Sequence, residues 1–239
     1  MMRSVTICDV RIDCVTLDEA VERALAMQRN GEVCRVFTPN ALMLEKCRHD
    51  VRLSELLNRA TLSLPDGSGV LRAAKRIGVN LPERVAGIDF GEKLLSRAAK
   101  EGLSVFLLGG ARGITERAAF ELQKKNPDLR ICGTHHGFFS MTGEENEQVC
   151  ALIRAAAPDI LFVCMGFPMQ ETWICSNLSR LPSVRIAAGL GGSLDVWSGC
   201  IKRAPHALRV ARLEWAWRML REPKRLKDLP SLARFYWKT

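Results

Sequence analysis

The stretch Ile160-Leu161-Phe162-Val163-Cys164 is followed at once by Met165-Gly166-Phe167-Pro168-Met169-Gln170-Glu171. Five consecutive apolar residues are typical of a strand buried on both faces of a sheet, because a strand with one wet face would alternate apolar and polar residues. The glycine and proline that follow indicate a turn, and residues 170–180 then show the pattern of an amphipathic helix. This strand, turn and helix form the repeating unit of a parallel α/β sheet.

The same unit recurs along the chain. The other apolar runs are Val33–Phe37, Thr61–Leu64, Val105–Leu108, Leu129–Cys132 and Val184–Ala188, and the other amphipathic segments are 41–60, 68–78, 89–101, 113–125 and 143–156. We therefore predict a doubly wound α/β fold whose mostly parallel sheet carries helices on both faces. Residues 5–16 alternate better and predict an N-terminal hairpin.

Positive charge is concentrated at the C-terminal end. Residues 202–239 hold 11 of the 35 Lys and Arg but three of the 26 acids, so this segment has a net charge of +8 (11 − 3) and the rest +1 (24 − 23). Four of the five Trp and the only Tyr follow residue 196. Cations interleaved with Trp and Leu suit the headgroup boundary of an anionic bilayer. We predict a catalytic core over residues 1–201 and a basic, helical, membrane-associating appendage over residues 202–239.

Two other interpretations of this segment stay open from its composition. A terminal helix could dock its Trp side chains on the protein's own core and leave its arginines solvated. A basic stripe with aromatic residues also fits the phosphates and bases of a nucleic acid.

Cysteine usage and hydropathy indicate the compartment. Nine Cys occur without a C-x-x-C pair or a Cys/His cluster at zinc spacing, so we expect them to be reduced. No run of about 18 uncharged apolar residues predicts a membrane span. Charged residues appear too early near the N-terminus for a signal-peptide core. We expect a cytoplasmic protein, attached peripherally to the inner face of the cell membrane.

Ligands in such sheets bind beyond the carboxyl ends of the strands. Each predicted strand here is followed by a segment that is rich in glycine or polar residues. These segments are Thr38–Asn40, Pro65–Gly69, Gly109–Gly113, His135–Phe139, Met165–Glu171 and Gly189–Asp195. We expect them to converge on one edge of the sheet and to form the site there.

Asp66 is the strongest single candidate for a catalytic residue. It lies between Pro65 and Gly67 directly after a strand, where a fixed carboxylate can act as a general base. It could equally form an Asx-turn or cap the helix that begins near residue 68. Thr38 and Asn40 on the neighbouring loop could orient a substrate, or cap the helix that begins near residue 41.

Two glycine pairs, Gly109-Gly110 and Gly191-Gly192, precede helices and could present backbone N–H groups to a diphosphate. Glycine is also common at such turns for steric reasons alone. Arg84 could neutralise the same diphosphate or form an ordinary surface ion pair. No D-x-D motif occurs and the His residues do not cluster, so we predict a site without metal, with diphosphate charge balanced by backbone dipoles and Arg.

The candidate motifs also occur together in a known order. They are Phe37–Asn40, Pro65–Gly69, Glu83–Asp89, Leu107–Gly110, His136–Phe139, Gly166–Glu171, Gly191–Asp195, Gly199–Pro205 and Leu213–Arg218. This set resembles the WecG/TagA/CpsF family of bacterial glycosyltransferases over about residues 5–226. The blocks at 166–171 and 202–205 are specific, whereas the glycine pairs are not.

The resemblance implies a single Rossmann-like domain with a C-terminal appendage. It implies inverting transfer of a sugar from a UDP-sugar to a polyprenyl-diphosphate-linked acceptor, in cell-surface polysaccharide or teichoic-acid-type synthesis, with no cofactor and no metal. The implied partners are the UDP-sugar, the lipid-linked acceptor and an anionic membrane surface that the appendage contacts as it closes the site. Nucleic acid is not among the expected partners, and a homo-oligomer is left open.

The resemblance also assigns roles to residues. Asp66 matches the family's proposed base and Thr38 lies beside it, and we expect Asn40 and Gln170 to orient the sugars. Residues expected to bind the donor are Arg84, Gly109, Gly110, His136, Gly137, Phe138, Gly166, Pro168, Glu171, Gly191, Gly192 and Asp195. Appendage residues expected at the diphosphate are Lys202, Arg203, Arg212, Arg218 and Arg221. The family often has Tyr at the position of Phe138, so a stacking role survives here and a hydroxyl hydrogen bond does not.

Two other classes of protein remain as alternatives. A nucleotide-dependent oxidoreductase would need a dinucleotide fingerprint, and the spacing of Gly109, Gly110 and Gly113 does not provide one. A non-catalytic membrane- or nucleic-acid-binding module would make Asp66 a simple cap.

Overall fold

Six parallel strands form the centre of the protein in a computed structural model, which describes residues 3–205, 217 and 228–238. The strands are β3 (Cys34–Phe37), β4 (Leu62–Ser63), β5 (Ser104–Gly109), β6 (Arg130–His135), β7 (Ile160–Cys164) and β8 (Ile186–Gly189). Each coincides with one of the six apolar runs, and β5, β7 and β8 are buried along their whole length. The predicted α/β class and the parallel sheet are confirmed.

The strand order is β4-β3-β8-β7-β5-β6. The chain first builds β3 and β4, crosses to the far side for β5 and β6, and returns inward through β7 and β8. β8 therefore pairs with β3, with Cys34 opposite Ile186 and Val36 opposite Ala188. The loops that follow β3, β4, β7 and β8 consequently leave the same part of the carboxyl edge, where α/β sheets bind their ligands.

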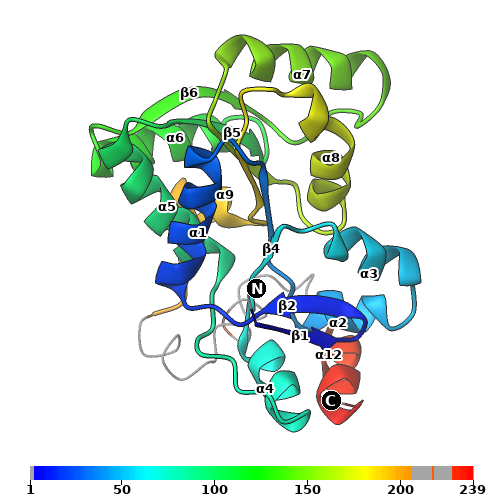
Figure 1. Cartoon of the computed structure of the whole chain (residues 1–239). Coiled ribbons are helices and arrows are strands. Elements are labelled where there is room, and N and C mark those ends of the chain that lie inside the picture. The colour runs from blue at the N-terminus through cyan, green and yellow to red at the C-terminus, as the bar shows by residue number, and fades with distance from the viewer. Residues whose placement is uncertain (1–2, 206–216, 218–227, 239) are drawn as a thin grey trace.

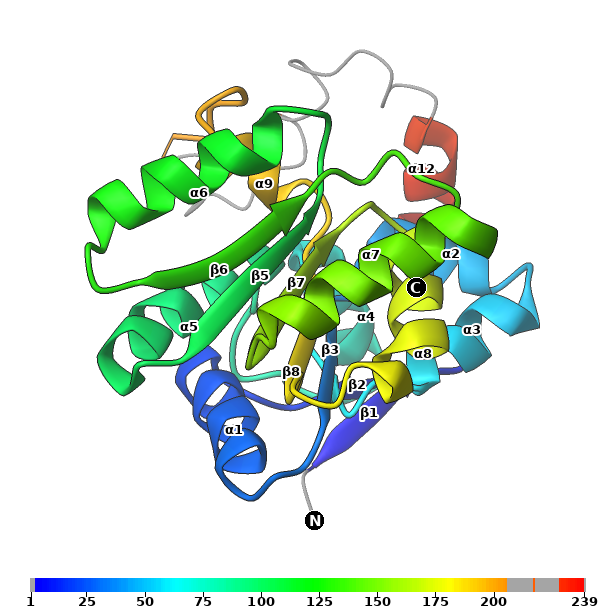
Figure 2. The same ribbon diagram turned by 90° about the horizontal axis from the view of Figure 1, so that it is seen from above.

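Helices cover both faces of this Rossmann-like sheet, as Figure 2 shows. One face is covered by α1 (Leu17–Arg29), α5 (Gly87–Glu101), α6 (Ile114–Lys125) and α9 (Ser193–Trp197). The other is covered by α2 (Ala41–Cys47), α3 (Val51–Asn58), α7 (Gly143–Ala156) and α8 (Met169–Asn177), the last continued by a short 3₁₀ helix, Leu178–Arg180. The hairpin of β1 (Ser4–Ile7) and β2 (Val10–Asp13) joins the second core together with α4 (Ser68–Arg76), so the predicted hairpin is also present.

Two helical segments differ from the expectation. The helix expected over residues 41–60 is divided into α2 and α3, because the side chain of Asp50 accepts a hydrogen bond from the Arg52 amide and starts a new helix. The helix α1 was not predicted at all. Its start is a capping box in which Thr16 and Glu19 bond each other's backbone amides.

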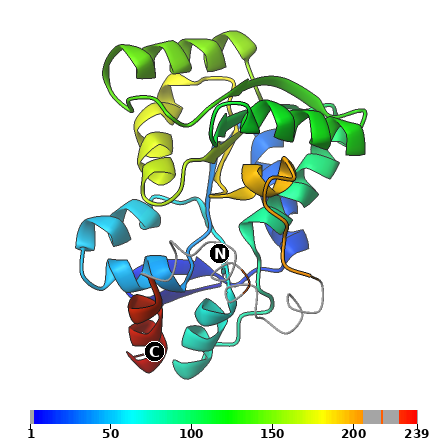
Figure 3. The same ribbon diagram turned by 180° about the vertical axis from the view of Figure 1, so that it is seen from behind.

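The C-terminal helix α12 (Leu229–Lys238) packs against α2 and lies beside α4 (Figures 1 and 3). Phe235 is fully buried in the second core, whereas Trp237 on the same helix is 88% exposed. The Arg76 guanidinium donates a hydrogen bond to the Tyr236 carbonyl at 3.2 Å, which ties α4 to α12. A tail aromatic therefore docks on the core, as one alternative held, and among the described residues of the tail it is Phe235 that is fully buried. The boundary near residue 201 stays a prediction.

Phe235 and Trp237 give a matched pair for testing this docking. Phe235→Ala should lower the free energy of unfolding by about 3–5 kcal/mol, because it leaves a cavity in a closed core. Trp237→Ala should change it by less than about 0.5 kcal/mol, because the ring is exposed. Urea unfolding followed by circular dichroism measures both, and equal effects of the two substitutions would show that α12 does not dock as described.

Candidate active site

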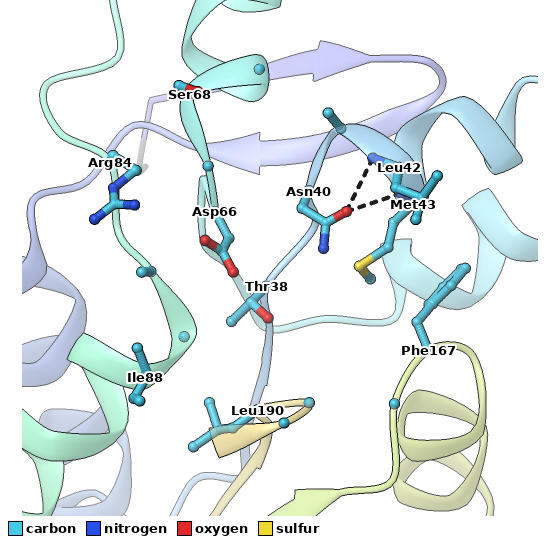
Figure 4. Close-up of a pocket in the computed structure, with 18 of the residues that line it drawn as sticks. Thr38, Asn40, Leu42, Met43, Asp66, Ser68, Arg84, Ile88, Phe167 and Leu190 are labelled. Atoms are coloured by element: carbon cyan, nitrogen blue, oxygen red, sulfur yellow. Dashed lines mark hydrogen bonds between the residues drawn. The ribbon is translucent and has the colours of Figure 1, made fainter. Parts of the chain in front are cut away.

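A pocket of about 350 Å³ opens beyond the carboxyl ends of β3, β4 and β8. Its walls come from the loops after these strands and after β7, from the start of α5, and from α12. The polar and charged residues among its described lining are Thr38, Asn40, Asp66, Ser68, Arg84, Gln170, Ser193, Asp228 and Tyr236. Figure 4 shows the central part of this set. The predicted convergence of polar strand ends is therefore present at one half of the sheet edge.

Asp66 is held in this pocket by its backbone. Its amide donates to the Pro39 carbonyl at 3.1 Å, and the Leu64 amide donates to the Phe37 carbonyl at 2.8 Å, so the loops after β3 and β4 are fastened together. Gly67, which has no side chain and a φ of +93°, occupies the N-cap position of α4 directly after Asp66. The Asp66 carboxylate points toward Thr38 in Figure 4.

Thr38 and Asn40 each have a partner in the protein. The Thr38 hydroxyl donates to the Gly189 carbonyl at 3.3 Å and so links the ends of β3 and β8. The Asn40 side-chain oxygen accepts from the Leu42 and Met43 amides, both at 3.1 Å, and caps α2. The capping interpretation therefore holds for Asn40. Its amide nitrogen is turned away from these two amides and remains on the pocket side (Figure 4).

Gln170 connects two loops of the pocket. Its side-chain oxygen accepts from the Gly166 amide at 3.2 Å and from the Gly191 amide at 2.9 Å. Its side-chain nitrogen donates to Glu171 at 2.8 Å, and the residue is only 3% exposed. Gln170 is therefore a brace between the loops after β7 and β8, and its polar atoms are already used in that role.

Glu171 lies fully buried behind this brace. One carboxyl oxygen accepts the bond from Gln170, and the other makes no hydrogen bond within the part of the chain that the structure describes. Burial raises the pKa of the Glu171 carboxyl to about 7, against the smaller opposing effect of the hydrogen bond from Gln170. Glu171 supports the pocket from beneath and is not part of its described lining.

The glycine pair at the end of β5 is explained by close packing. A Cβ on Gly109 would lie 2.3 Å from the Cys164 carbonyl oxygen, so only glycine fits there. The Gly110 amide donates to that same carbonyl at 3.1 Å, and the Gly137 amide donates to the Gly110 carbonyl at 2.9 Å. The steric interpretation therefore accounts for Gly109-Gly110. These residues and the neighbouring His136 and Phe138 lie at the ends of β5 and β6, outside the described lining of the pocket.

The second glycine pair does line the pocket. Gly191 and Gly192 lie between β8 and α9, and the Gly191 amide is taken by Gln170. Gly166 lines it as well, whereas Pro168 and Asp195 do not. The sequence expectation thus placed the loops after all six strands in one site. In the structure, the loops after β3, β4, β7 and β8 line the pocket around Asp66, and those after β5 and β6 lie outside its described lining.

Arginine residues meet at Asp89 beside the pocket. Arg203 pairs with Asp89 at 2.6 Å, and Arg84 approaches the other oxygen of this carboxylate at 3.9 Å. Arg84 lines the pocket, whereas Arg203 anchors the segment after α9 to α5. Lys202 is exposed, and its carbonyl accepts from the Trp217 indole at 3.3 Å. The predicted residues Arg212, Arg218 and Arg221 lie outside the described residues.

The C-terminal helix and the residue before it contribute to the pocket side chains that the sequence expectation missed: Leu232 and Tyr236 on α12, and Asp228 directly before it. A Cβ on Gly69 would lie 2.7 Å from Ala41 Cβ and 3.1 Å from the Tyr236 hydroxyl oxygen, so glycine allows α2, α4 and α12 to meet here. The signal available in the sequence was that the only Tyr of the chain lies in its basic aromatic tail.

Among the described residues, no three His, Cys, Asp or Glu side chains are grouped so that they could hold a metal ion. No helix in the described ranges has the length and apolar character needed to cross a bilayer.

The fold and pocket together define a Rossmann-like protein with a carboxylate at the ligand-binding edge of its sheet. The sequence model described as "Glycosyl transferase WecG/TagA/CpsF family" matches residues 5–239. The chain belongs to this family of glycosyltransferases, and the predicted resemblance is confirmed.

Curated relatives of this chain include proteins of Staphylococcus aureus. The proteins of strains MW2 and NCTC 8325 are each 34% identical over 236 residues, which cover 98% of this chain and 91% of the relative. Both are named N-acetylglucosaminyldiphosphoundecaprenol N-acetyl-beta-D-mannosaminyltransferase. The similarity therefore extends over nearly the whole of both chains.

The buried carboxyl of Glu171 predicts a pH-dependent stability. The unfolded chain should release this proton near pH 4.5 and the folded protein only near pH 7, so the wild type should lose stability as pH rises between these values. The loss should reach about 1.4 kcal/mol per pH unit. Glu171→Gln carries no such proton, so its free energy of unfolding relative to wild type should rise over this range and level off above it.

Urea unfolding at a series of pH values measures this difference. Glu144→Gln, on the exposed start of α7, is the matched control and should run parallel to wild type. A constant difference between Glu171→Gln and wild type from pH 4.5 to 8 would contradict the raised pKa.

Proposed function

We propose that this protein transfers an N-acetylhexosamine from a UDP-sugar to an N-acetylglucosamine that is linked through a diphosphate to a polyprenol. The observation that carries the proposal is the placement of Asp66 in the pocket at the carboxyl edge of the sheet. Family membership supports the reaction class, and the names of the Staphylococcus aureus relatives support the lipid-linked acceptor. The UDP-sugar donor is an extension of the family resemblance.

In the proposed reaction Asp66 acts as the general base. Its carboxylate removes the proton from an acceptor hydroxyl while that oxygen attacks the anomeric carbon of the donor sugar. The bond between this carbon and the diphosphate oxygen breaks, and UDP leaves with the bonding electron pair. Because attack and departure occur on opposite faces, the configuration at the anomeric carbon is inverted.

The departing diphosphate needs positive charge near the pocket. Arg84 is the only Lys or Arg in the described lining, and Asp89 beside it holds its direction. The loop at Gly191 and Gly192 offers backbone close to the same space. We assign the donor's diphosphate to this loop and to Arg84, aided by the tail arginines Arg212, Arg218 and Arg221, and without a metal ion.

The remaining polar residues position these groups. Thr38 lies beneath Asp66 and joins β3 to β8, and the amide nitrogen of Asn40 is available to a sugar oxygen. Gln170 acts indirectly, because it sets the distance between the loops at Gly166 and Gly191. We therefore propose Thr38 and Asn40 as substrate-orienting residues and Gln170 as a positioning residue.

A lipid-linked acceptor requires access to a membrane surface. Trp237 is 88% exposed on α12, and the segment from residue 202 has a net charge of +8. Exposed Trp and clustered cations together favour the interface of an anionic leaflet. We propose that the protein works as a peripheral protein on the inner face of the cell membrane, with α12 near the lipid.

Asp66→Asn should reduce the transfer rate by about 10²–10⁴-fold, because the amide keeps the size of the side chain but cannot accept the proton. Affinity for the UDP-sugar should change by less than about threefold. Radiolabelled transfer to a short-chain diphosphate-linked acceptor measures the rate, and Asp128→Asn, exposed on the loop before β6, is the control. Turnover of Asp66→Asn within about threefold of wild type would remove Asp66 from the mechanism.

Transfer should continue at an undiminished rate in EDTA. The reason is that no metal-ligand cluster occurs among the described residues, while arginine and backbone dipoles can neutralise the leaving group. The measurement is the initial rate before and after chelation, with Mg²⁺ or Mn²⁺ added back. Activity that disappears in EDTA and returns with either ion would contradict this prediction.

A further inference from the structure

A second hollow of about 650 Å³ lies beside the pocket, where α4 and α12 come together. Its lining includes Ser68, Leu71, Arg72, Lys75, Leu81 and Tyr236. None of these residues belongs to the set assigned above to the donor or to the chemistry. Figures 1 and 3 show α4 and α12 side by side at this end of the molecule.

This hollow adjoins the pocket that holds Asp66. Ser68 and Tyr236 line both spaces, so they form the boundary between them. The Tyr236 hydroxyl lies close to Gly69 at the start of α4, which fixes the position of this boundary. A ligand with two chemically different ends could therefore occupy both spaces at once.

The hollow is lined by both cationic and apolar side chains. Arg72 and Lys75 are three residues apart on α4 and so share a helix face. The Arg72 guanidinium lies over the Tyr236 ring at 5.5 Å, and Leu71 and Leu81 add apolar surface. No Asp or Glu is found in its described lining, where the uncharged polar side chains are those of Ser68, Asn80 and Tyr236. Such a surface fits a multiply charged phosphate that is joined to a hydrocarbon chain.

We propose that this hollow binds the diphosphate and the first isoprenyl units of the acceptor, with Arg72 and Lys75 paired to the diphosphate and Leu71 and Leu81 against the hydrocarbon. This inference rests on the proposed function, which supplies a diphosphate-linked acceptor. It identifies the side of the pocket from which the acceptor enters, namely past Ser68 and Tyr236.

The direction of attack supports this assignment. An inverting displacement requires the acceptor oxygen and the leaving diphosphate to lie on opposite faces of the donor sugar. Figure 4 shows Asp66 and Thr38 between Ser68 and Leu190. The donor's diphosphate is assigned to the loop after Leu190 and to Arg84, so the acceptor is expected to enter past Ser68 and Tyr236, where the second hollow adjoins the pocket.

The test compares Arg72→Gln/Lys75→Gln with Lys124→Gln/Lys125→Gln, a control that removes two exposed charges from the last turn of α6. The acceptor is N-acetylglucosamine linked by a diphosphate to a short, detergent-dispersed farnesyl chain. We expect the first variant to raise the KM for this acceptor by about tenfold to a hundredfold, with the KM for the UDP-sugar unchanged. The control should resemble wild type in both constants.

Folding and charge are separated by further variants. Lys75→Glu leaves the stacking of Arg72 on Tyr236 in place and should raise the acceptor KM, whereas Lys75→Arg keeps the positive charge and should leave this KM close to that of wild type. An unchanged thermal unfolding midpoint shows that α12 is still docked. The binding of farnesyl diphosphate itself, measured by calorimetry, should weaken in parallel, while inorganic phosphate should bind far more weakly than farnesyl diphosphate.

Three results would overturn the proposal. They are an acceptor KM within twofold of wild type, a rise in the KM of the UDP-sugar instead, or an effect seen only when the acceptor is embedded in anionic vesicles. The last would show that Arg72 and Lys75 contact the membrane surface rather than the diphosphate. If wild type transfers no sugar at all, the proposed function fails, and the binding of farnesyl diphosphate to wild type and variant still decides the subsite.

Discussion

The pairing of β3 with β8 is the constraint on which the site depends. These strands are about 150 residues apart in sequence, and their parallel register brings Thr38 to within 3.3 Å of the Gly189 carbonyl. Because β3 also pairs with β4, Asp66 is delivered to the same place by the loop contacts at Phe37 and Pro39. β8, the last strand of the described sheet in sequence, pairs with β3, the first. The pocket is therefore lined by segments from near the beginning and near the end of the chain.

A series of buried hydrogen bonds through Gln170 and Glu171 stabilises this junction. Gln170 uses its amide to hold the loops after β7 and β8, and Glu171 receives the remaining hydrogen bond from Gln170. A fully buried carboxyl is costly when it is charged, which is why its pKa is raised and why the neutral form suits this position. The glycines on these loops are set by similar packing limits, since a Cβ on Gly189 would lie 2.8 Å from the Gln170 nitrogen. The shape of the pocket is therefore set by hydrogen bonds and packing contacts within the protein.

The sequence predicted the sheet well because its inner strands β5, β7 and β8 are buried along their whole length, and burial on both faces leaves a run of apolar residues. It predicted the location of Asp66 because strand ends in a parallel sheet share one edge. The sequence did not separate the β3–β4–β8 half of that edge from the β5–β6 half. The local pattern of apolar residues predicts each strand but does not predict that β8 pairs with β3. Asn40 and Gln170 show a second limit: a polar side chain after a strand has the same local pattern whether it faces a substrate or a backbone amide. The start of α1 was missed although the capping box of Thr16 and Glu19 was available as a signal.

The last helix shows why composition alone could not assign the tail to one surface. Phe235, Tyr236 and Trp237 are consecutive, and a rotation of about 100° per residue turns them in three directions. Phe235 enters the core, Tyr236 forms a wall of the pocket, and Trp237 is exposed. Since Phe235 holds the helix on the core, the wall at Tyr236 exists only while α12 is docked. Core packing, pocket shape and the exposed aromatic surface are thus joined through a single helical turn.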